Sequence, residues 1–147
     1  MSSKESTSID RPNRTVYIDG VFDLFHYGHI RLLNRVRKMG TRLIVGVVTD
    51  EDALSYKRTP IIPLPYRLKL LQELGIADLV IPAQLRITKE YIEEHGIDLV
   101  VHGNDSQQSD FFKVPIEMGI MEYIPYTEGI STTEIMRWIK DNLASSF

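Results

Sequence analysis

Short apolar runs alternate with helical patterns through most of this sequence. The runs typical of strands cover residues 16–18, 42–49, 78–82, 98–101 and 121–124. Patterns typical of helices cover residues 30–39, 66–74, 89–95, 114–118 and 132–143. Such alternation indicates a doubly wound α/β fold, whose sheet is mostly parallel and is buried on both faces. We therefore predict an α/β domain built on a mostly parallel five-stranded sheet.

The length of the chain fits one domain behind a short tail. With 147 residues the chain can bury one core, and it is too short for two domains of ordinary size. Residues 1–13 are rich in serine and charge and include a proline, so we expect a flexible N-terminal tail. The domain is predicted over residues 14–147.

The composition excludes several classes of function. No apolar run approaches the roughly 20 residues that a membrane-spanning helix needs. The sequence has no cysteine, which excludes disulfides, thiolate nucleophiles and cysteine-ligated zinc. A polar N-terminus without a secretory signal favours a cytoplasmic location. The net charge of -3 gives no general attraction to nucleic acid, so a small phosphorylated ligand is the better partner.

Two histidines flank a glycine where the first strand passes into the first helix. His26 and His29 follow the first apolar run, and the helical pattern begins directly after them. Gly28 allows the backbone to approach a phosphate closely, while the imidazoles offer donors on either side. Free amides and the positive end of the helix dipole also favour anions there. The junction is therefore predicted to bind phosphate in nucleotide chemistry, with surface or capping roles as the alternative.

Other polar residues are expected at the same edge of the sheet. Ligands of such sheets bind beyond the carboxyl ends of the strands, where the strand order reverses. Residues 49–50, residues 102–105 and the segment before Thr132 follow strands, as the histidines do, so the four should converge. Asp23 is nearer to the histidines than Asp19 and is predicted to orient an imidazole or the nucleotide. A turn or helix cap is the alternative.

A loop with two cations follows the second strand. Lys57 and Arg58 precede three prolines that are expected to prevent regular structure until Tyr66. Such a loop can close over a triphosphate and offset the charge that develops in the transition state. A solvated charge pair is the alternative. Arg67 begins the next helix, an unfavourable place for a cation, so an anionic partner is expected.

Three hydroxyl side chains, at residues 131–133, lead into the last helix behind Gly129. The spacing of Ser131 and Glu134 is that of a capping box, which is a sufficient explanation, although the same groups also suit phosphate or ribose. No Walker P-loop, G-x-G-x-x-G or H-E-x-x-H motif occurs, which argues against P-loop, dinucleotide and such zinc enzymes. Trp138 and the methionines are expected in the core.

Five segments together resemble the cytidylyltransferase family. They are Gly20-Val-Phe-Asp-Leu-Phe-His-Tyr-Gly-His29, the Lys57-Arg58 loop, Tyr66-Arg67, His102-Gly-Asn-Asp105 and Thr127-Glu-Gly-Ile-Ser-Thr-Thr133. The last segment makes the resemblance specific, because it is much rarer than H-x-G-H. The chain looks most like the CTP-dependent enzymes that act on phosphoethanolamine, phosphocholine or glycerol 3-phosphate. The resemblance implies a Rossmann-like fold and transfer of CMP to a phosphorylated alcohol, with release of pyrophosphate.

The resemblance also implies roles for the residues of these motifs. His26 and His29 would stabilise the transition state at the α-phosphate, Lys57 would contact the phosphates of both substrates, and Arg67 would assist. The residues implied in nucleotide binding are Gly20, Val21, Phe22, Asp23, Gly28, His102, Gly103, Asn104, Asp105, Thr127, Gly129, Ile130, Ser131, Thr132 and Thr133. Those implied in acceptor binding are Lys57, Asp19, Asn104 and Tyr126. Magnesium is expected on CTP without a dedicated protein site, and the resemblance implies a homodimer.

Two departures from the family pattern concern the second substrate. The arginine that precedes T-x-G-I-S-T-T in the family is Tyr126 here, so one cationic phosphate contact is missing. Either Arg58 or another residue compensates, or the acceptor differs. Where choline enzymes place aromatic residues for a quaternary ammonium, this chain has Leu85 and the polar run 106–108. Phosphoethanolamine is therefore the first expectation, with glycerol 3-phosphate, phosphocholine and hydroxyalkyl phosphonates left open.

Three other functions compete with this interpretation. An ATP-dependent adenylyltransferase shares H-x-G-H, but residues 129–133 favour CTP. A fragment of a class I aminoacyl-tRNA synthetase is the weaker rival, because a K-M-S-K-S-like motif and room for tRNA-binding domains are missing. A non-catalytic nucleotide-binding module is the third, and Tyr126 makes it conceivable. The sequence ends at Phe147 without the long amphipathic helix of some choline enzymes, so no membrane partner is expected.

Overall fold

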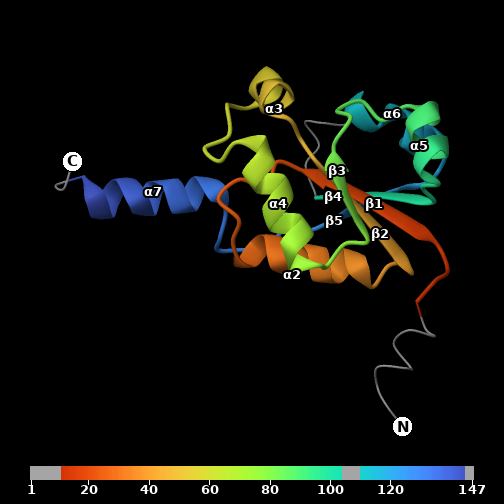
Figure 1. Cartoon of the computed structure of the whole chain (residues 1–147), viewed down its shortest axis with the longest axis horizontal. Helices are drawn as coiled ribbons and strands as arrows, with labels where there is room; N and C mark the ends of the chain where they lie inside the picture. The colour runs from red at the N-terminus through yellow and green to blue at the C-terminus, as the bar shows by residue number, and fades with distance from the viewer. Residues whose placement is uncertain (1–10, 104–109, 145–147) are drawn as a thin grey trace, which may run out of the picture.

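The computed structural model describes residues 11–103 and 110–144, and it confirms the predicted α/β fold (Figure 1). Five strands form one sheet in the order β3-β2-β1-β4-β5, and every neighbouring pair is parallel. The strands are β1 (Thr15–Gly20), β2 (Arg42–Val47), β3 (Leu79–Pro82), β4 (Leu99–Gly103) and β5 (Met121–Ile124). The helices are α2 (Tyr27–Arg37), α3 (Asp50–Tyr56), α4 (Leu64–Leu74), α5 (Lys89–His95), α6 (Lys113–Glu117) and α7 (Thr132–Leu143).

Helices cover both faces of the sheet, which explains the continuous apolar runs in its central strands, such as 16–18 in β1 and 43–45 in β2. In β1, Val16 and Ile18 belong to the core that includes Leu33 of α2 and Leu71 of α4. Tyr17 belongs to a second core, on the side of α5. Successive residues of a strand face opposite sides, so a strand covered on both sides needs apolar residues at every position.

Two helices begin two or more residues earlier than the sequence indicated. Helix α2 begins at Tyr27 instead of Ile30, because the side chain of His26 caps it. Helix α4 begins at Leu64, with Pro65 in its first turn, so the expectation of irregular structure up to Tyr66 is wrong. A proline is tolerated there because the first N–H groups of a helix have no partner within it.

Helix α3 was not predicted, and it shortens the second strand to end at Val47. The hydroxyl of Thr49 accepts a hydrogen bond from the Asp52 N–H at 3.2 Å and so caps this helix. Acids at positions 50–52 stabilise its first turn through the helix dipole. Because Ala53 is its only buried residue, the helix shows no apolar periodicity that a sequence could reveal.

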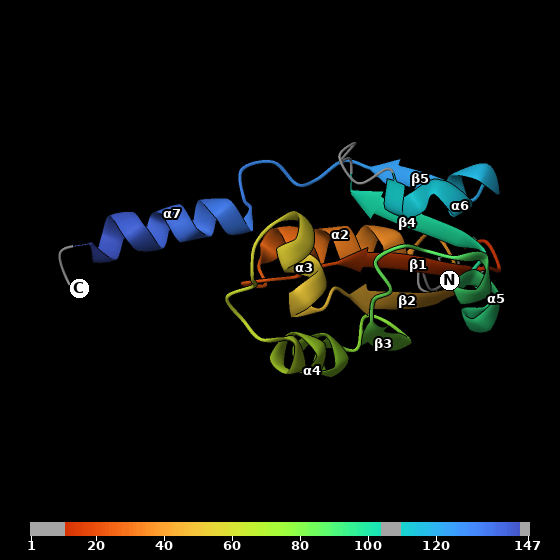
Figure 2. The ribbon, with the colours of Figure 1, turned by 90° about the horizontal axis from the view of Figure 1, so that it is seen from above.

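Helix α7 has the predicted bounds, but it projects away from the sheet (Figures 1 and 2). None of its residues is buried, and Trp138 is 43% exposed, so the expectation that Trp138 packs in the core is wrong. Met39 packs partly against the core, whereas Met118 is exposed. No helix in the described ranges is long and apolar enough to cross a membrane.

The strand order creates a switch point at the carboxyl end of the sheet. The chain leaves β1 toward β2 on one side, while β4 pairs with β1 on the other. The turn after Gly20, which precedes α2, begins at this point, and β4 ends there at Gly103. Parallel α/β sheets bind ligands in this position.

Candidate active site

Two adjoining cavities lie at this edge of the sheet. A small cavity of about 130 Å³ includes Asp19 and His102, and a large one of about 480 Å³ includes the segment 129–134. The large cavity falls within the roughly 300–1,000 Å³ of small-molecule sites, and the small one would take only part of a ligand. Six residues line both cavities: His29, Leu32, Lys57, Arg58, Tyr126 and Thr132. The ends of β1 and β4, the histidines, the cation loop and the start of α7 therefore converge. Residues 49–50, which were expected with them, line neither cavity, because Thr49 caps α3 and Asp50 pairs with Arg67.

The two histidines form a reciprocal cap at the start of α2. Nδ1 of His26 accepts the N–H of Gly28 at 3.0 Å, and Nδ1 of His29 accepts the N–H of His26 at 3.1 Å. Each Nδ1 therefore carries a lone pair, so hydrogen-bond assignment places the proton of each neutral ring on Nε2. The capping role weighed from the sequence is present, and it leaves both Nε2–H groups available as donors.

The surroundings of the histidines keep them uncharged. Burial lowers the pKa of His26, and burial together with the charges of His26 and Lys57 lowers the pKa of His29 to about 3. The rings lie 3.9 Å apart between centroids, and Phe25 stacks on His29 at 5.1 Å. The pair thus presents neutral donors held by packing, which suits a developing negative charge better than it suits proton removal.

Gly28 is required between the histidines for space. A Cβ atom at this position would lie 2.9 Å from Cε1 of His26 and 3.2 Å from Cγ2 of Ile130. A larger residue would therefore displace the His26 ring from its cap. Its contact with Ile130 also shows how closely α2 approaches the loop before α7.

Asp23 organises the segments around the site through hydrogen bonds. Its carboxylate accepts the N–H groups of Ile61 at 2.8 Å, Ile62 at 2.9 Å and Leu24 at 3.1 Å. Its backbone carbonyl accepts the hydroxyl of Thr132 at 2.9 Å. The side chain is 3% exposed and orients no imidazole. Asp23 therefore ties the cation loop and the start of α7 to the turn before α2.

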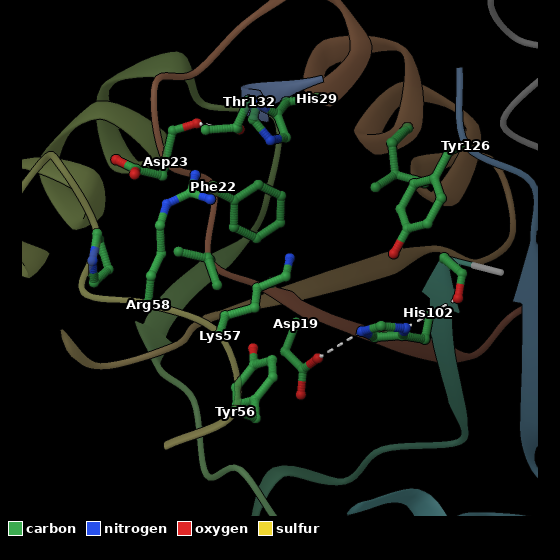
Figure 3. Close-up of a pocket in the computed structure, with 15 residues that line it drawn as sticks. Asp19, Phe22, Asp23, His29, Tyr56, Lys57, Arg58, His102, Tyr126 and Thr132 are labelled. Atoms are coloured by element: carbon green, nitrogen blue, oxygen red, sulfur yellow. Dashed lines mark hydrogen bonds and ion pairs between the residues drawn. The ribbon is translucent and has the colours of Figure 1, made fainter. Parts of the chain in front are cut away.

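Lys57 and Arg58 both line the two cavities from the loop after α3 (Figure 3). Lys57 extends toward the centre of the small cavity, and Arg58 extends toward Phe22 and Asp23. Among the described residues neither side chain has an ion pair or a hydrogen bond. The sequence predicted a loop of this kind.

Arg67 occupies a different place from the one that its predicted catalytic role requires. It is 1% exposed and lines neither cavity. Its guanidinium donates to the carbonyl of Ile62 at 2.7 Å and to those of Val21 and Val48 at 2.8 Å, and it pairs with Asp50 at 2.5 Å. The anionic partner expected for Arg67 is therefore Asp50, and its donors are engaged by the protein.

Asp19 is a buried carboxyl group at the wall of the small cavity. It is 7% exposed, and burial raises its pKa to about 7, although a hydrogen bond from Tyr17 opposes this shift. Nε2 of His102 lies 3.7 Å from its Oδ1, and Nδ1 of His102 bonds the carbonyl of Gly103 at 3.0 Å. Within the described ranges, no lysine or arginine pairs with Asp19.

Two tyrosines near Asp19 were missed from the sequence. The hydroxyl of Tyr17 lies 3.2 Å from that of Tyr91 in the core, and a Cβ atom at Gly46 would lie 2.2 Å from the Tyr17 oxygen. Gly46 therefore makes room for this hydroxyl. The available signal was the spacing of Tyr17 and Asp19, because residues two apart in a strand face the same side.

The segment before α7 supplies both caps and cavity walls. Ser131 caps α7 by accepting the Glu134 N–H at 3.1 Å, whereas the Glu134 carboxylate pairs with Arg137. Gly129 adopts a φ of 85°, which favours glycine. The predicted residues that line the large cavity from this segment are Thr127, Gly129, Ile130, Ser131, Thr132 and Thr133.

The remaining predicted residues line one or both cavities, except for two that lie outside the described residues. Gly20, Val21, Phe22 and Gly103 line the small cavity, and Gly28 lines the large one. Tyr126 lines both and is 53% exposed, with its ring so close to Gly103 that a Cβ atom there would lie 2.2 Å from it. Asn104 and Asp105 lie outside the described residues.

Comparison with known proteins decides the family. Residues 17–137 match the family described as cytidylyltransferase-like. The chain belongs to the cytidylyltransferase-like family. It is 39% identical over 118 residues to glycerol-3-phosphate cytidylyltransferase of Bacillus subtilis (strain 168), with 79% of this chain and 89% of that protein covered.

Other members of the cytidylyltransferase-like family are longer. Ethanolamine-phosphate cytidylyltransferase of Dictyostelium discoideum is 39% identical over 142 residues, which cover 90% of this chain and 39% of that protein. The ethanolamine-phosphate cytidylyltransferase of Arabidopsis thaliana is 35% identical, over 82% of this chain and 31% of that protein. The chain thus spans between about a third and two fifths of the length of these two relatives.

Solved structures agree with the fold. The lipopolysaccharide core biosynthesis protein of Thermoplasma volcanium superimposes with a TM-score of 0.66 at 28% identity, over 78% of this chain and 98% of that chain. Pantothenate synthetase of Thermus thermophilus superimposes with a TM-score of 0.51 at 13% identity, over 99% of this chain and 75% of that chain. The second likeness concerns the fold alone.

Proposed function

We propose that residues 14–147 form the catalytic domain of a CTP-dependent cytidylyltransferase, which transfers CMP to a small phosphorylated alcohol. One observation carries this proposal. Two neutral imidazoles, whose Nε2–H groups are free to donate, line the large cavity, and one of them, that of His29, stands with Lys57 where the two cavities meet. A site for transfer between two substrates needs such a meeting point, and the relatives named above are cytidylyltransferases.

The two cavities suit the two substrates. The large cavity offers the hydroxyls and amides at the start of α7 to the nucleotide. The small cavity offers the carboxyl group of Asp19 to the head group of the acceptor. The α-phosphorus of CTP and the acceptor phosphate would then meet beside His29 and Lys57, which line both cavities.

The residues of this site fit a direct displacement. An oxygen of the acceptor phosphate attacks the α-phosphorus, a new P–O–P bond forms, and the bond to the β-phosphate breaks as pyrophosphate leaves. A phosphate oxygen is already ionised at neutral pH, so positioning and charge neutralisation matter more than a base. The Nε2–H groups of His26 and His29 donate to oxygens of the α-phosphate as charge develops, and Lys57 holds the two phosphates together.

Magnesium is proposed to enter on the triphosphate, where it would neutralise charge. Among the described residues, the carboxylate of Asp23 is already occupied by three backbone N–H groups. No group of three His, Cys, Asp or Glu residues that could hold a metal occurs in the described ranges. A homodimer and a cytoplasmic location stay predictions.

Phosphoethanolamine is proposed as the acceptor, on the basis of Asp19. This carboxyl group is buried at a cavity wall, and among the described residues it pairs with no lysine or arginine. An isolated buried charge is costly, so an ammonium group in the small cavity would stabilise its ionised form. Glycerol 3-phosphate offers only hydroxyls there. Phosphocholine and hydroxyalkyl phosphonates are the further acceptors to test.

A substrate panel tests this function. Pyrophosphate release should be measured with CTP or ATP, each combined with phosphoethanolamine, phosphocholine, glycerol 3-phosphate or a hydroxyalkyl phosphonate. We expect turnover with CTP and fastest turnover with phosphoethanolamine. Turnover with ATP and none with CTP would instead support an adenylyltransferase. Binding of CTP without conversion of any acceptor would support the non-catalytic module.

A further inference from the structure

The position of Arg58 sets it apart from the other arginines of the chain. It lines both cavities, together with His29 and Lys57. Its side chain reaches toward Phe22 and Asp23, whereas the neighbouring Lys57 reaches toward the centre of the small cavity (Figure 3). The two cations therefore approach the meeting point of the cavities from one loop.

The guanidinium of Arg58 is not used to stabilise the fold. It forms no hydrogen bond or ion pair with any described residue, in contrast to Arg67, whose donors are taken up by carbonyls and Asp50. No ion pair joins it to Asp23, whose carboxylate accepts three backbone N–H groups instead. Arg58 thus keeps its donors for a ligand.

The cavities need this charge if they bind a triphosphate. His26 and His29 are neutral, and Lys57 and Arg58 are the only lysine and arginine among the described residues that line the cavities. Tyr126, which lines both cavities as well, supplies no positive charge. An arginine fork matches two phosphate oxygens, which a lysine cannot do.

The loop that carries Arg58 is held at both ends. The N–H of Lys57 bonds the carbonyl of Ala53 at 2.9 Å, and the N–H groups of Ile61 and Ile62 bond Asp23. Two adjacent cations that pair with no described carboxylate repel each other. The anchored loop keeps them together in spite of this unfavourable electrostatic energy. A polyanion between them would relieve that repulsion.

From these contacts we infer that Arg58 binds the triphosphate through a pair of phosphate oxygens, as the second cation of the reaction centre. The inference rests on the proposed function. It also predicts that the charge can be relocated, since residue 126 lines the same two cavities. An arginine introduced at position 126 should then replace the lost one.

The test compares Arg58→Ala, Tyr126→Arg and the double variant with the wild-type protein. Arg58→Ala should lower kcat/KM for CTP by about tenfold to a hundredfold and should weaken CTP binding in calorimetry, on the scale of one charge-assisted pair. The double variant should recover most of this loss, and Arg58→Lys should recover part of it. Arg42→Ala is the matched control, because Arg42 is an exposed arginine at the opposite end of the sheet.

The outcomes separate the two proposals. Unchanged CTP binding and turnover in Arg58→Ala would overturn the inference and leave the proposed function standing. A loss that Tyr126→Arg does not reverse would overturn the claim that the charge can be relocated. Weaker CTP binding in Arg58→Ala, in a protein that converts no acceptor, would support the inference and overturn the proposed function. A wild-type protein that binds no CTP would overturn both.

Discussion

Replacing His29 by alanine should lower kcat far more than it lowers stability. The imidazole has two separable contacts: Nδ1 accepts the His26 N–H at 3.1 Å, and Nε2 is left for a ligand where the cavities meet. Loss of one strong transition-state donor costs about 10²–10³ in kcat, or roughly 2.7–4 kcal/mol. Loss of a helix-cap hydrogen bond costs roughly 0.5–2 kcal/mol of the free energy of unfolding.

The assay must separate these two losses. We would measure kcat from pyrophosphate release at saturating substrates and the free energy of unfolding from urea titration. His95→Ala is the matched control, since His95 lies on α5 and lines neither cavity. Because the pKa of His29 is lowered to about 3, the ring is neutral throughout the neutral range, and the loss in kcat should not vary with pH there. A folded His29→Ala protein whose kcat stays within about threefold of the wild type would refute the reasoning.

Three further variants test other parts of the structure. Arg67→Leu should lower the free energy of unfolding, measured by urea titration, by roughly 3–5 kcal/mol, because it leaves three carbonyls and Asp50 without their buried partner. A loss below about 1 kcal/mol would contradict a structural role for Arg67. The pKa of Asp19 is raised to about 7 and only its ionised form attracts an ammonium group, so KM for phosphoethanolamine should fall about tenfold as the pH rises from about 6 to 8. Asp19→Asn should abolish this pH dependence of KM. If the variant kept the pH profile of the wild type, Asp19 would be excluded from the acceptor site. Gly28→Ala should lower kcat by up to about a hundredfold by displacing the His26 ring, and a near-normal kcat would show that the ring position is not critical.

The sequence predicted the sheet because its central strands are covered on both faces and therefore carry continuous apolar runs. It predicted α5 with its observed bounds, since Gly96 ends that helix in the left-handed conformation. It missed α3, which buries only Ala53 and is defined by the cap at Thr49. It also misplaced Trp138, because periodicity shows that a helix has an apolar face and does not show whether anything covers that face.

The site was likewise predicted only in part. Motif spacing placed His26, His29 and Lys57 together, because residues at the carboxyl ends of parallel strands share one edge of the sheet. The structural roles of Asp23 and Arg67, which hold distant segments together by hydrogen bonds, could not be predicted from the sequence. Their partners are backbone groups of distant segments, such as the N–H of Ile61, and these leave no signal in residue types.

The most direct test of the central claim is phosphorus NMR of the reaction itself. The intact protein, CTP, magnesium and phosphoethanolamine should give a new diphosphate diester together with an equal amount of pyrophosphate. The same mixture with His29→Ala should give neither at a comparable rate. Release of inorganic phosphate without the diester, or an unchanged spectrum in the presence of bound CTP, would contradict the claim that this chain transfers CMP to a phosphorylated alcohol.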